Sequence, residues 1–204
     1  MSVQTKNFDT EKHMRIPASD PRYTSMETYK TQPPYDGSVR TYDNFLQKES
    51  LQEILNIFNN DTVWSFTGTS NESSELNTRF WAAQNLEKLD LFKDLWGSVQ
   101  MNCGLNNYEL ARCYANGQTG GMSGSPHTDD GDLTALFYPS DWKHFLGGHL
   151  YFVKDNHIAH MVEYVQNRLV LFPANLEHYS GAPISIYPDI RVSVAFKLRK
   201  VPDW

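Results

Sequence analysis

Apolar residues in the first half of the chain recur at helical intervals. Leu51, Ile54 and Phe58 are spaced by three and four positions, and Ser50 has a glutamate three positions later, the spacing of a capping box. These features predict a helix over about residues 50–60, because such spacing places the apolar side chains on one face.

Between this helix and residue 98 the pattern predicts one strand and a second helix. Trp64, Ser65 and Phe66 are typical of a short strand, because aromatic residues flank a small polar one. Further along, Phe80, Leu86, Leu89 and Leu95 predict a helix over about 76–96. We expect both helices to support a sheet.

From residue 98 onward, apolar runs of strand length alternate with Gly, Pro, Asn and Asp. This pattern is typical of a β-sandwich or jelly roll. The segment 116–126 contains four glycines and is predicted to be a loop at the mouth of the barrel. The expected strands are about 107–115, 132–138, 149–154, 160–165, 168–173 and 190–199.

Residues 1–40 differ from the rest of the chain. They hold four prolines and many polar groups, with little apolar periodicity. Such a composition favours an extended N-terminal arm over an independent domain, and leaves 41–204 as the folded domain. The arm could wrap the core, cover the active-site mouth, mediate dimer contacts or be a flexible tail.

Composition narrows the class of protein. The 204 residues are 40% hydrophobic and 13% aromatic, which fits a globular chain, and the net charge of −6 argues against nucleic acid as a partner. We find no secretory signal and no apolar run of membrane-spanning length, so we expect a cytoplasmic protein. Cys103 and Cys113 are predicted to be buried thiols rather than a disulfide.

The segment from Ser125 to Asp132 contains the most informative chemistry. His127 and Asp129 are two positions apart, so on an extended strand both side chains point to the same face. His178 would complete a set of two histidines and one carboxylate, the facial triad of non-haem Fe(II) oxygenases. Arg191 follows His178 by 13 positions and would suit a dicarboxylic acid near such a metal.

Other histidines are weaker candidates for metal binding. His157 and His160 have an i, i+3 spacing, but they lie among turn and strand residues, where that spacing does not favour a shared metal. We interpret His149 as a strand residue. His13 and His144 are expected on the surface.

The order of motifs over about 41–204 resembles the 2-oxoglutarate/Fe(II)-dependent dioxygenase superfamily, and within it the prolyl-4-hydroxylase-like branch. The resemblance depends on six features in sequence: a strand with Tyr and Gly, His-x-Asp, an aliphatic strand, Gly-Gly-x-Leu, an apolar strand ending in Phe, and a distal His followed by a basic residue. They correspond to Tyr114 to Gly117, His127 to Asp129, Thr134 to Tyr138, Gly147 to Leu150, Leu169 to Phe172, and His178 with Arg191.

The resemblance implies a mainly β (α+β) fold, a double-stranded β-helix (jelly roll) with N-terminal helices packed on one sheet. It also implies Fe(II) held by His127, Asp129 and His178, with 2-oxoglutarate and O2 as cosubstrates and ascorbate as an optional reductant. In this superfamily 2-oxoglutarate is decarboxylated to succinate and CO2 while the substrate is oxidised. An acidic residue at 129, where related halogenases have a small one, indicates a hydroxylase.

Contacts to 2-oxoglutarate are expected from several side chains. Arg191 would bind the distal carboxylate, since a planar guanidinium fits a carboxylate in a bidentate way; its structural alternatives are stacking on a neighbour or pairing with Asp189. Ser193 shares its strand face. Tyr114 matches the family tyrosine that often contacts the cosubstrate. Further expected lining residues are Tyr108 and Arg112 in one strand and Thr134, Leu136 and Tyr138 in another, with Trp142 at the substrate opening or in the core.

Three functions remain open from the sequence. The first is hydroxylation of an unactivated C–H bond in a prolyl or other residue of a peptide or protein. The second is hydroxylation of a free amino acid or other small metabolite. The third, from a different class, is a non-catalytic jelly-roll binding module. The chain is expected to be a monomer or a homodimer.

Overall fold

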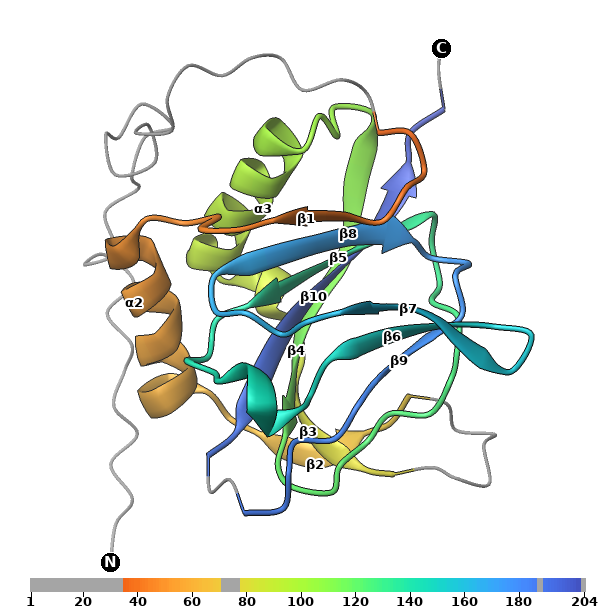
Figure 1. The fold of residues 1–204 in the computed structure, drawn as a ribbon. Coiled ribbons are helices and arrows are strands. Elements are labelled where there is room, and N and C mark those ends of the chain that lie inside the picture. The colour runs from red at the N-terminus through yellow and green to blue at the C-terminus, as the bar shows by residue number, and fades with distance from the viewer. Residues whose placement is uncertain (1–34, 71–77, 187–188, 203–204) are drawn as a thin grey trace, which may run out of the picture.

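A computed structural model describes residues 35–70, 78–186 and 189–202. Their strands form two antiparallel sheets (Figure 1). The large sheet has the order β1-β8-β5-β10-β4-β3-β2, and the small sheet has the order β7-β6-β9. The strands are β1 Arg40–Tyr42, β2 Ser65–Gly68, β3 Phe80–Ala83, β4 Tyr108–Gln118, β5 Leu133–Tyr138, β6 Leu150–Lys154, β7 His157–Val162, β8 Arg168–Pro173, β9 His178–Ser180 and β10 Arg191–Lys200.

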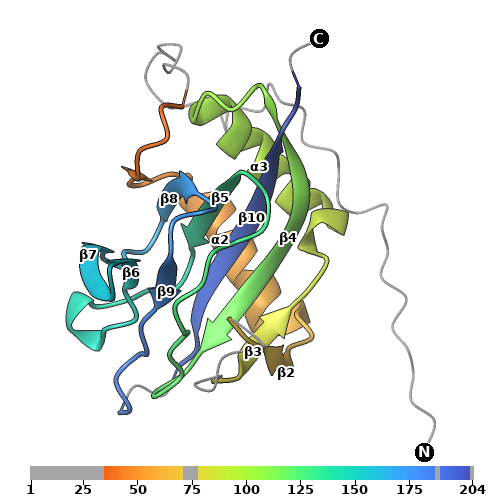
Figure 2. The same ribbon diagram turned by 90° about the vertical axis from the view of Figure 1, so that its right-hand side faces the viewer.

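Two α-helices lie on the side of the large sheet away from the small one (Figure 2). They are α2, Lys48–Asn56, which continues into a π-helical turn at Ile57–Asp61, and α3, Asp90–Asn102. Helix α2 begins two residues before Ser50, so the predicted Ser50–Glu53 capping pair lies inside the helix and not at its start. The helix itself is confirmed.

The central strands of the large sheet are buried on both faces, as β8 shows. Leu169 and Leu171 belong to the core cluster shared with α2 and α3, whereas Val170 and Phe172 belong to the cluster shared with the small sheet. Alternate side chains of a strand point to opposite faces, so one strand supplies both cores. A strand buried on both faces is an apolar run without polar alternation, as this one is. The predicted mainly β jelly roll, with helices packed on one sheet, is confirmed.

The predicted helix over 76–96 is wrong in its first part, of which residues 76 and 77 lie outside the described part of the chain. Phe80–Ala83 form strand β3, and α3 begins only at Asp90. Asn85 has a φ of 61°, a left-handed conformation that ends regular structure between them. The aromatic pair Phe80 and Trp81 favours a strand, and its pairing with β4 outweighs the helical spacing.

The predicted strand positions are mostly confirmed. Six strands lie where the alternation predicts them, although β7 begins at His157, earlier than expected, after a turn at Asp155 and Asn156 with positive φ. Strand β4 extends to Gln118, so the first residues of the predicted 116–126 loop belong to the sheet. Strand β1 begins at Arg40, and the predicted arm falls almost entirely outside the described residues. Within the described residues, no helix is long and apolar enough to span a membrane.

Candidate metal and cosubstrate site

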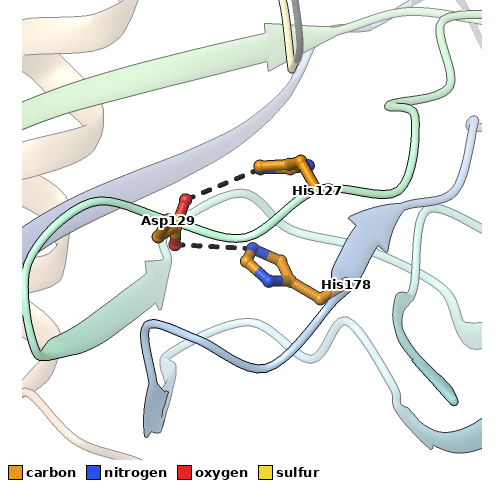
Figure 3. A group of neighbouring side chains, drawn as sticks. All are labelled: His127, Asp129 and His178. Carbon is orange, nitrogen blue, oxygen red and sulfur yellow. Dashed lines mark ion pairs between the residues drawn. The ribbon is translucent and has the colours of Figure 1, made fainter. Parts of the chain in front are cut away.

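His127, Asp129 and His178 meet in space although Asp129 and His178 are 49 positions apart in the sequence (Figure 3). The backbones of His127 and His178 pair directly: the amide of His127 donates to the carbonyl of His178 at 3.0 Å, and the amide of His178 donates back at 2.9 Å. This isolated bridge connects the end of the glycine-rich segment to β9. The fold therefore brings the distal histidine beside the His-x-Asp motif.

Both imidazoles are oriented by backbone carbonyls. Nδ1 of His127 lies 2.8 Å from the carbonyl oxygen of Ser125, and Nδ1 of His178 lies 2.8 Å from that of Leu176. A carbonyl oxygen only accepts a hydrogen bond, so in both rings Nδ1 carries the proton and Nε2 is left with a free lone pair. Such contacts fix the tautomer and orientation of metal-binding histidines.

The two Nε2 atoms face the carboxylate of Asp129. Nε2 of His127 is 3.5 Å from Oδ1, and Nε2 of His178 is 3.4 Å from Oδ2 (Figure 3). One ligand atom from each residue lies within 4.8 Å of the others. Two imidazole nitrogens and one carboxylate oxygen converging from one side fit a metal with open coordination positions, and this donor set suits Fe(II).

Asp129 is held as a carboxylate by its neighbours. The hydroxyl of Thr134 donates to Oδ2 at 2.6 Å, and Nζ of Lys197 forms an ion pair with the same oxygen. Burial raises the pKa of this carboxyl, but the neighbouring His127 side chain and the positive charge of Lys197 outweigh it, so the pKa lies well below its usual range. The side chain is thus ready to bind a cation.

His178 is held in its neutral form. Burial lowers its pKa to about 4, and the opposing attraction of Asp129 does not compensate. Its ring is 4.7 Å from that of Phe172, centroid to centroid, in an edge-to-face contact, and these apolar surroundings explain the desolvation. A neutral imidazole is the form that binds a metal.

Arg191 lies in the same cavity and is 1% exposed. One guanidinium nitrogen donates to Oε1 of Gln118 at 2.6 Å, while Nε is buried and has no hydrogen-bond partner within the described part of the chain. The guanidinium stacks on Tyr164 at 4.4 Å, but among the described residues it forms no ion pair with a carboxylate. A buried cation without an anion is costly, so this geometry fits an anionic ligand such as the distal carboxylate of 2-oxoglutarate.

Gly148 explains part of the Gly-Gly-x-Leu motif. Its φ is 72°, and a Cβ atom there would lie 2.7 Å from Cδ of Arg191 and 2.8 Å from Nε. Only glycine adopts this conformation without strain and also leaves the arginine in place. The second glycine of the motif therefore defines where the guanidinium lies.

The cavity has a volume of about 360 Å³ and extends from Arg191 past the three candidate ligands to the edge of the large sheet. Of the residues predicted to contact 2-oxoglutarate, Arg191, Tyr114, Ser193 and Leu136 line it. Its lining also includes Arg112, Thr128, Asp130 and Tyr138 near the site, and Thr67, Ser70, Phe80, Gln84 and Asn116 from β2 to β4.

Two of the predicted lining residues, Thr134 and Tyr108, are not among the cavity-lining residues. Thr134 instead donates its hydroxyl hydrogen to Asp129. Tyr108 packs against the core cluster on the helix side. A bulge explains the difference: Arg112 pairs with Lys197 but Leu110 pairs with Leu198, so β4 has one extra residue here. Because side chains alternate, an extra residue moves Tyr108 and Leu110 to the opposite face from Arg112 and Tyr114.

Several polar residues of the site were not assigned to it from the sequence, Gln118 and Lys197 among them. Gln118 was placed in a loop because glycines follow it, although the alternation of Arg112, Tyr114 and Asn116 continues to this residue. Lys197 shares a strand face with Arg191 and Ser193, and its period-two spacing is the signal that could have found it. It is only 2% exposed.

Trp142 is buried in the core cluster, where its indole N–H donates to the carbonyl of Gly147 at 2.9 Å.

Solved structures share this fold at low sequence identity. A prolyl hydroxylase from Trichoplax adhaerens, in complex with a peptide fragment of the hypoxia inducible factor oxygen degradation domain, is 18% identical with a TM-score of 0.61 over 81% of this chain and 84% of that one. A Pseudomonas putida prolyl-4-hydroxylase is 17% identical with a TM-score of 0.57, over 80% and 94%. HygX from Streptomyces hygroscopicus, with nickel, 2-oxoglutarate and hygromycin B bound, is 11% identical with a TM-score of 0.62, over 79% and 82%.

The chain thus has the double-stranded β-helix fold of the 2-oxoglutarate/Fe(II) oxygenases, prolyl hydroxylases among them, and the predicted likeness is confirmed at the level of the fold. No family model matches the sequence, and no curated protein matches it. The particular reaction must therefore be argued from the residues of the site.

Proposed function

We propose that this protein is an Fe(II)- and 2-oxoglutarate-dependent dioxygenase that hydroxylates an unactivated C–H bond. The observation that carries the proposal is the combination, in one cavity, of a His-Asp-His cluster and a buried arginine that has no anionic partner among the described residues. A metal centre alone would fit many functions. A fixed cation that can bind a dicarboxylic acid narrows the possible functions to 2-oxoglutarate-dependent dioxygenases.

Each residue has a defined task in this proposal. His127, Asp129 and His178 hold Fe(II), and Arg191 binds the distal carboxylate of 2-oxoglutarate, with Tyr114, Ser193 and Leu136 around the cosubstrate. The iron and 2-oxoglutarate supply the oxidising chemistry, in which O2 is consumed and succinate and CO2 are released. The protein orients the reactants and limits the access of water.

The size and polarity of the cavity favour a small polar substrate over a peptide. At about 360 Å³ it is near the lower end for small-molecule sites, and part of it must accommodate 2-oxoglutarate. Hydroxyl and amide side chains dominate the part formed by β2, β3 and β4, with Thr67, Ser70, Gln84 and Asn116 among them. The peptide-bound prolyl hydroxylase and the hygromycin-bound HygX show that neighbours of this fold bind either class.

The test is to measure succinate release and metal binding in parallel. The purified protein with Fe(II), ascorbate and 2-oxoglutarate should produce succinate, and small metabolites should stimulate the rate. His178→Ala should lose Mn(II) binding, measured by calorimetry, together with succinate release. The matched control is His157→Ala, an exposed histidine of β7, which should keep both.

The binding-module alternative makes the opposite prediction. A non-catalytic jelly roll would bind a metal or 2-oxoglutarate without any release of succinate, whether or not candidate substrates are present. Full succinate release by His178→Ala would also refute the assignment of the metal site.

A further inference from the structure

Two cations face each other across the β4–β10 pair of the cavity wall. Arg112 and Lys197 are direct register partners. Both line the cavity, and both lie over the ring of Tyr114, at 5.1 and 5.8 Å from its centroid. Like charges directly opposite each other destabilise a sheet, so anions must offset them.

Consecutive aspartates offset these charges. Asp130 forms an ion pair with Arg112 at 2.5 Å, and Asp129 forms one with Lys197. Asp129 is also the candidate metal ligand, so binding of Fe(II) places a divalent cation on the carboxylate that balances Lys197. The metal-loaded site therefore lacks negative charge on the Lys197 side.

A count of the charges in the cavity with Fe(II) and 2-oxoglutarate bound also indicates a deficit of negative charge. Among the described residues, its lining has three cations (Arg112, Arg191 and Lys197) and two carboxylates (Asp129 and Asp130). Fe(II) and the 2-oxoglutarate dianion cancel each other, and metal-bound histidines are neutral. One positive charge is left, and a substrate with a carboxylate would neutralise it.

Arg112 has the geometry to bind that carboxylate. Its side chain is 50% exposed, whereas those of Lys197 and Arg191 are almost fully buried. One terminal nitrogen of Arg112 donates to Asp130, and its guanidinium lies over the ring of Tyr114. The orientation of the guanidinium is therefore fixed before a substrate binds. A guanidinium has five N–H donors, and most remain available to a second carboxylate.

We propose that the substrate is a small carboxylic acid, whose carboxylate binds Arg112 on the side of the cavity shared with Lys197. This inference rests on the proposed function. Arg191 serves the other end of the cavity, because it is six residues from Lys197 on the same strand, about 20 Å in an extended chain. The polar residues Thr67, Gln84 and Asn116 then contact the rest of the substrate.

The experiment compares acids with their neutral amides. Benzoate against benzamide, and propionate against propionamide, are titrated anaerobically into the protein loaded with Mn(II) and saturating 2-oxoglutarate. A second assay uses Fe(II) and compares how strongly α-amino acids and their amides stimulate the release of succinate. The variants are Arg112→Gln, Arg112→Lys, which keeps the charge, and the control Arg199→Gln on the exposed end of β10.

The wild type should bind each acid about tenfold or more tightly than its amide, the effect of one hydrogen-bonded contact between charged groups. Arg112→Gln should remove this preference, Arg112→Lys should retain part of it, and Arg199→Gln should leave it intact. Equal binding of acids and amides, absence of binding by either, or an unchanged preference in Arg112→Gln would overturn the inference. Succinate release stimulated by neutral compounds or peptides would overturn it too, while leaving the proposed reaction standing.

Discussion

The ammonium group of Lys197 forms an ion pair with the carboxylate of Asp129 inside the cavity, and both side chains are almost fully buried. Asp129 is therefore shared between a protein cation and the metal it is proposed to bind. In the metal-free protein Lys197 balances the buried carboxylate. In the metal-loaded protein that role passes mainly to the metal.

Lys197→Met should therefore destabilise the metal-free protein more than the loaded one. Removing one partner of a buried pair leaves the other uncompensated and costs about 3 kcal/mol of unfolding free energy. Urea unfolding with EDTA should show this loss, and with saturating Mn(II) the loss should fall to less than half. Lys200→Met, on the exposed end of the same strand, is the control and should change neither value. Equal losses under both conditions would exclude a charge shared with the metal.

The two cysteines should react slowly with thiol reagents in the native protein. Both are free and almost fully buried, and burial raises the pKa of Cys103 to about 12 and that of Cys113 above its usual value. The thiolate is the reactive form, so little of it exists at pH 8. A disulfide-exchange reagent should modify both within minutes in denaturant but only over hours without it. Rapid modification of the folded protein would contradict this burial.

The fold was largely predictable from local patterns because many of its strands are apolar runs bounded by turn residues. β8 is an example, since every residue from Leu169 to Phe172 is apolar and each faces one of two cores. The predicted helix over 76–96 failed where tertiary pairing took precedence: Phe80 and Trp81 belong to a strand that β4 completes. Local spacing does not contain that information.

The site was predictable to the extent that it depends on strand alternation. His127 forms an isolated bridge and Asp129 lies just beyond it, yet both point into the site as the spacing predicted, and Ser193 follows Arg191 on one face of β10. Tyr108 was misplaced because one bulged residue in β4 reverses the alternation, and a bulge depends on the partner strand. The pairing of Lys197 with Asp129 was not predictable either, because it requires knowing that β10 lies beside β5 and β4.

Arg191→Gln should weaken binding of 2-oxoglutarate. The guanidinium would lose a buried charge-assisted contact, which is worth about 2 kcal/mol or more and corresponds to roughly a 30-fold rise in Kd. The measurement is a titration of the Mn(II)-loaded protein with 2-oxoglutarate in the absence of O2. The Kd of Arg191→Lys for 2-oxoglutarate should lie between those of the wild type and Arg191→Gln, because lysine keeps the charge but lacks the planar guanidinium. A Kd within twofold of the wild type for Arg191→Gln would place the cosubstrate elsewhere in the cavity.

Gly147 and Gly148 provide a matched pair for testing how the position of Arg191 is set. Both have a φ of 72°, so alanine at either position strains the backbone, at a cost of order 1–3 kcal/mol. They differ in what a Cβ atom would meet: the carbonyl oxygen of Ala182 at 3.0 Å for Gly147, and Cδ of Arg191 at 2.7 Å for Gly148.

Gly148→Ala should therefore lower both the unfolding free energy and the affinity for 2-oxoglutarate, whereas Gly147→Ala should lower the unfolding free energy alone. Gly97→Ala, in helix α3 with no atom within 4 Å of the new methyl group, should raise stability by up to about 1 kcal/mol and leave cosubstrate binding unchanged. Urea unfolding and the anaerobic 2-oxoglutarate titration separate the two effects. If both glycine variants of the pair lost cosubstrate affinity equally, backbone strain would account for the loss, and the contact with Arg191 would have no separate role.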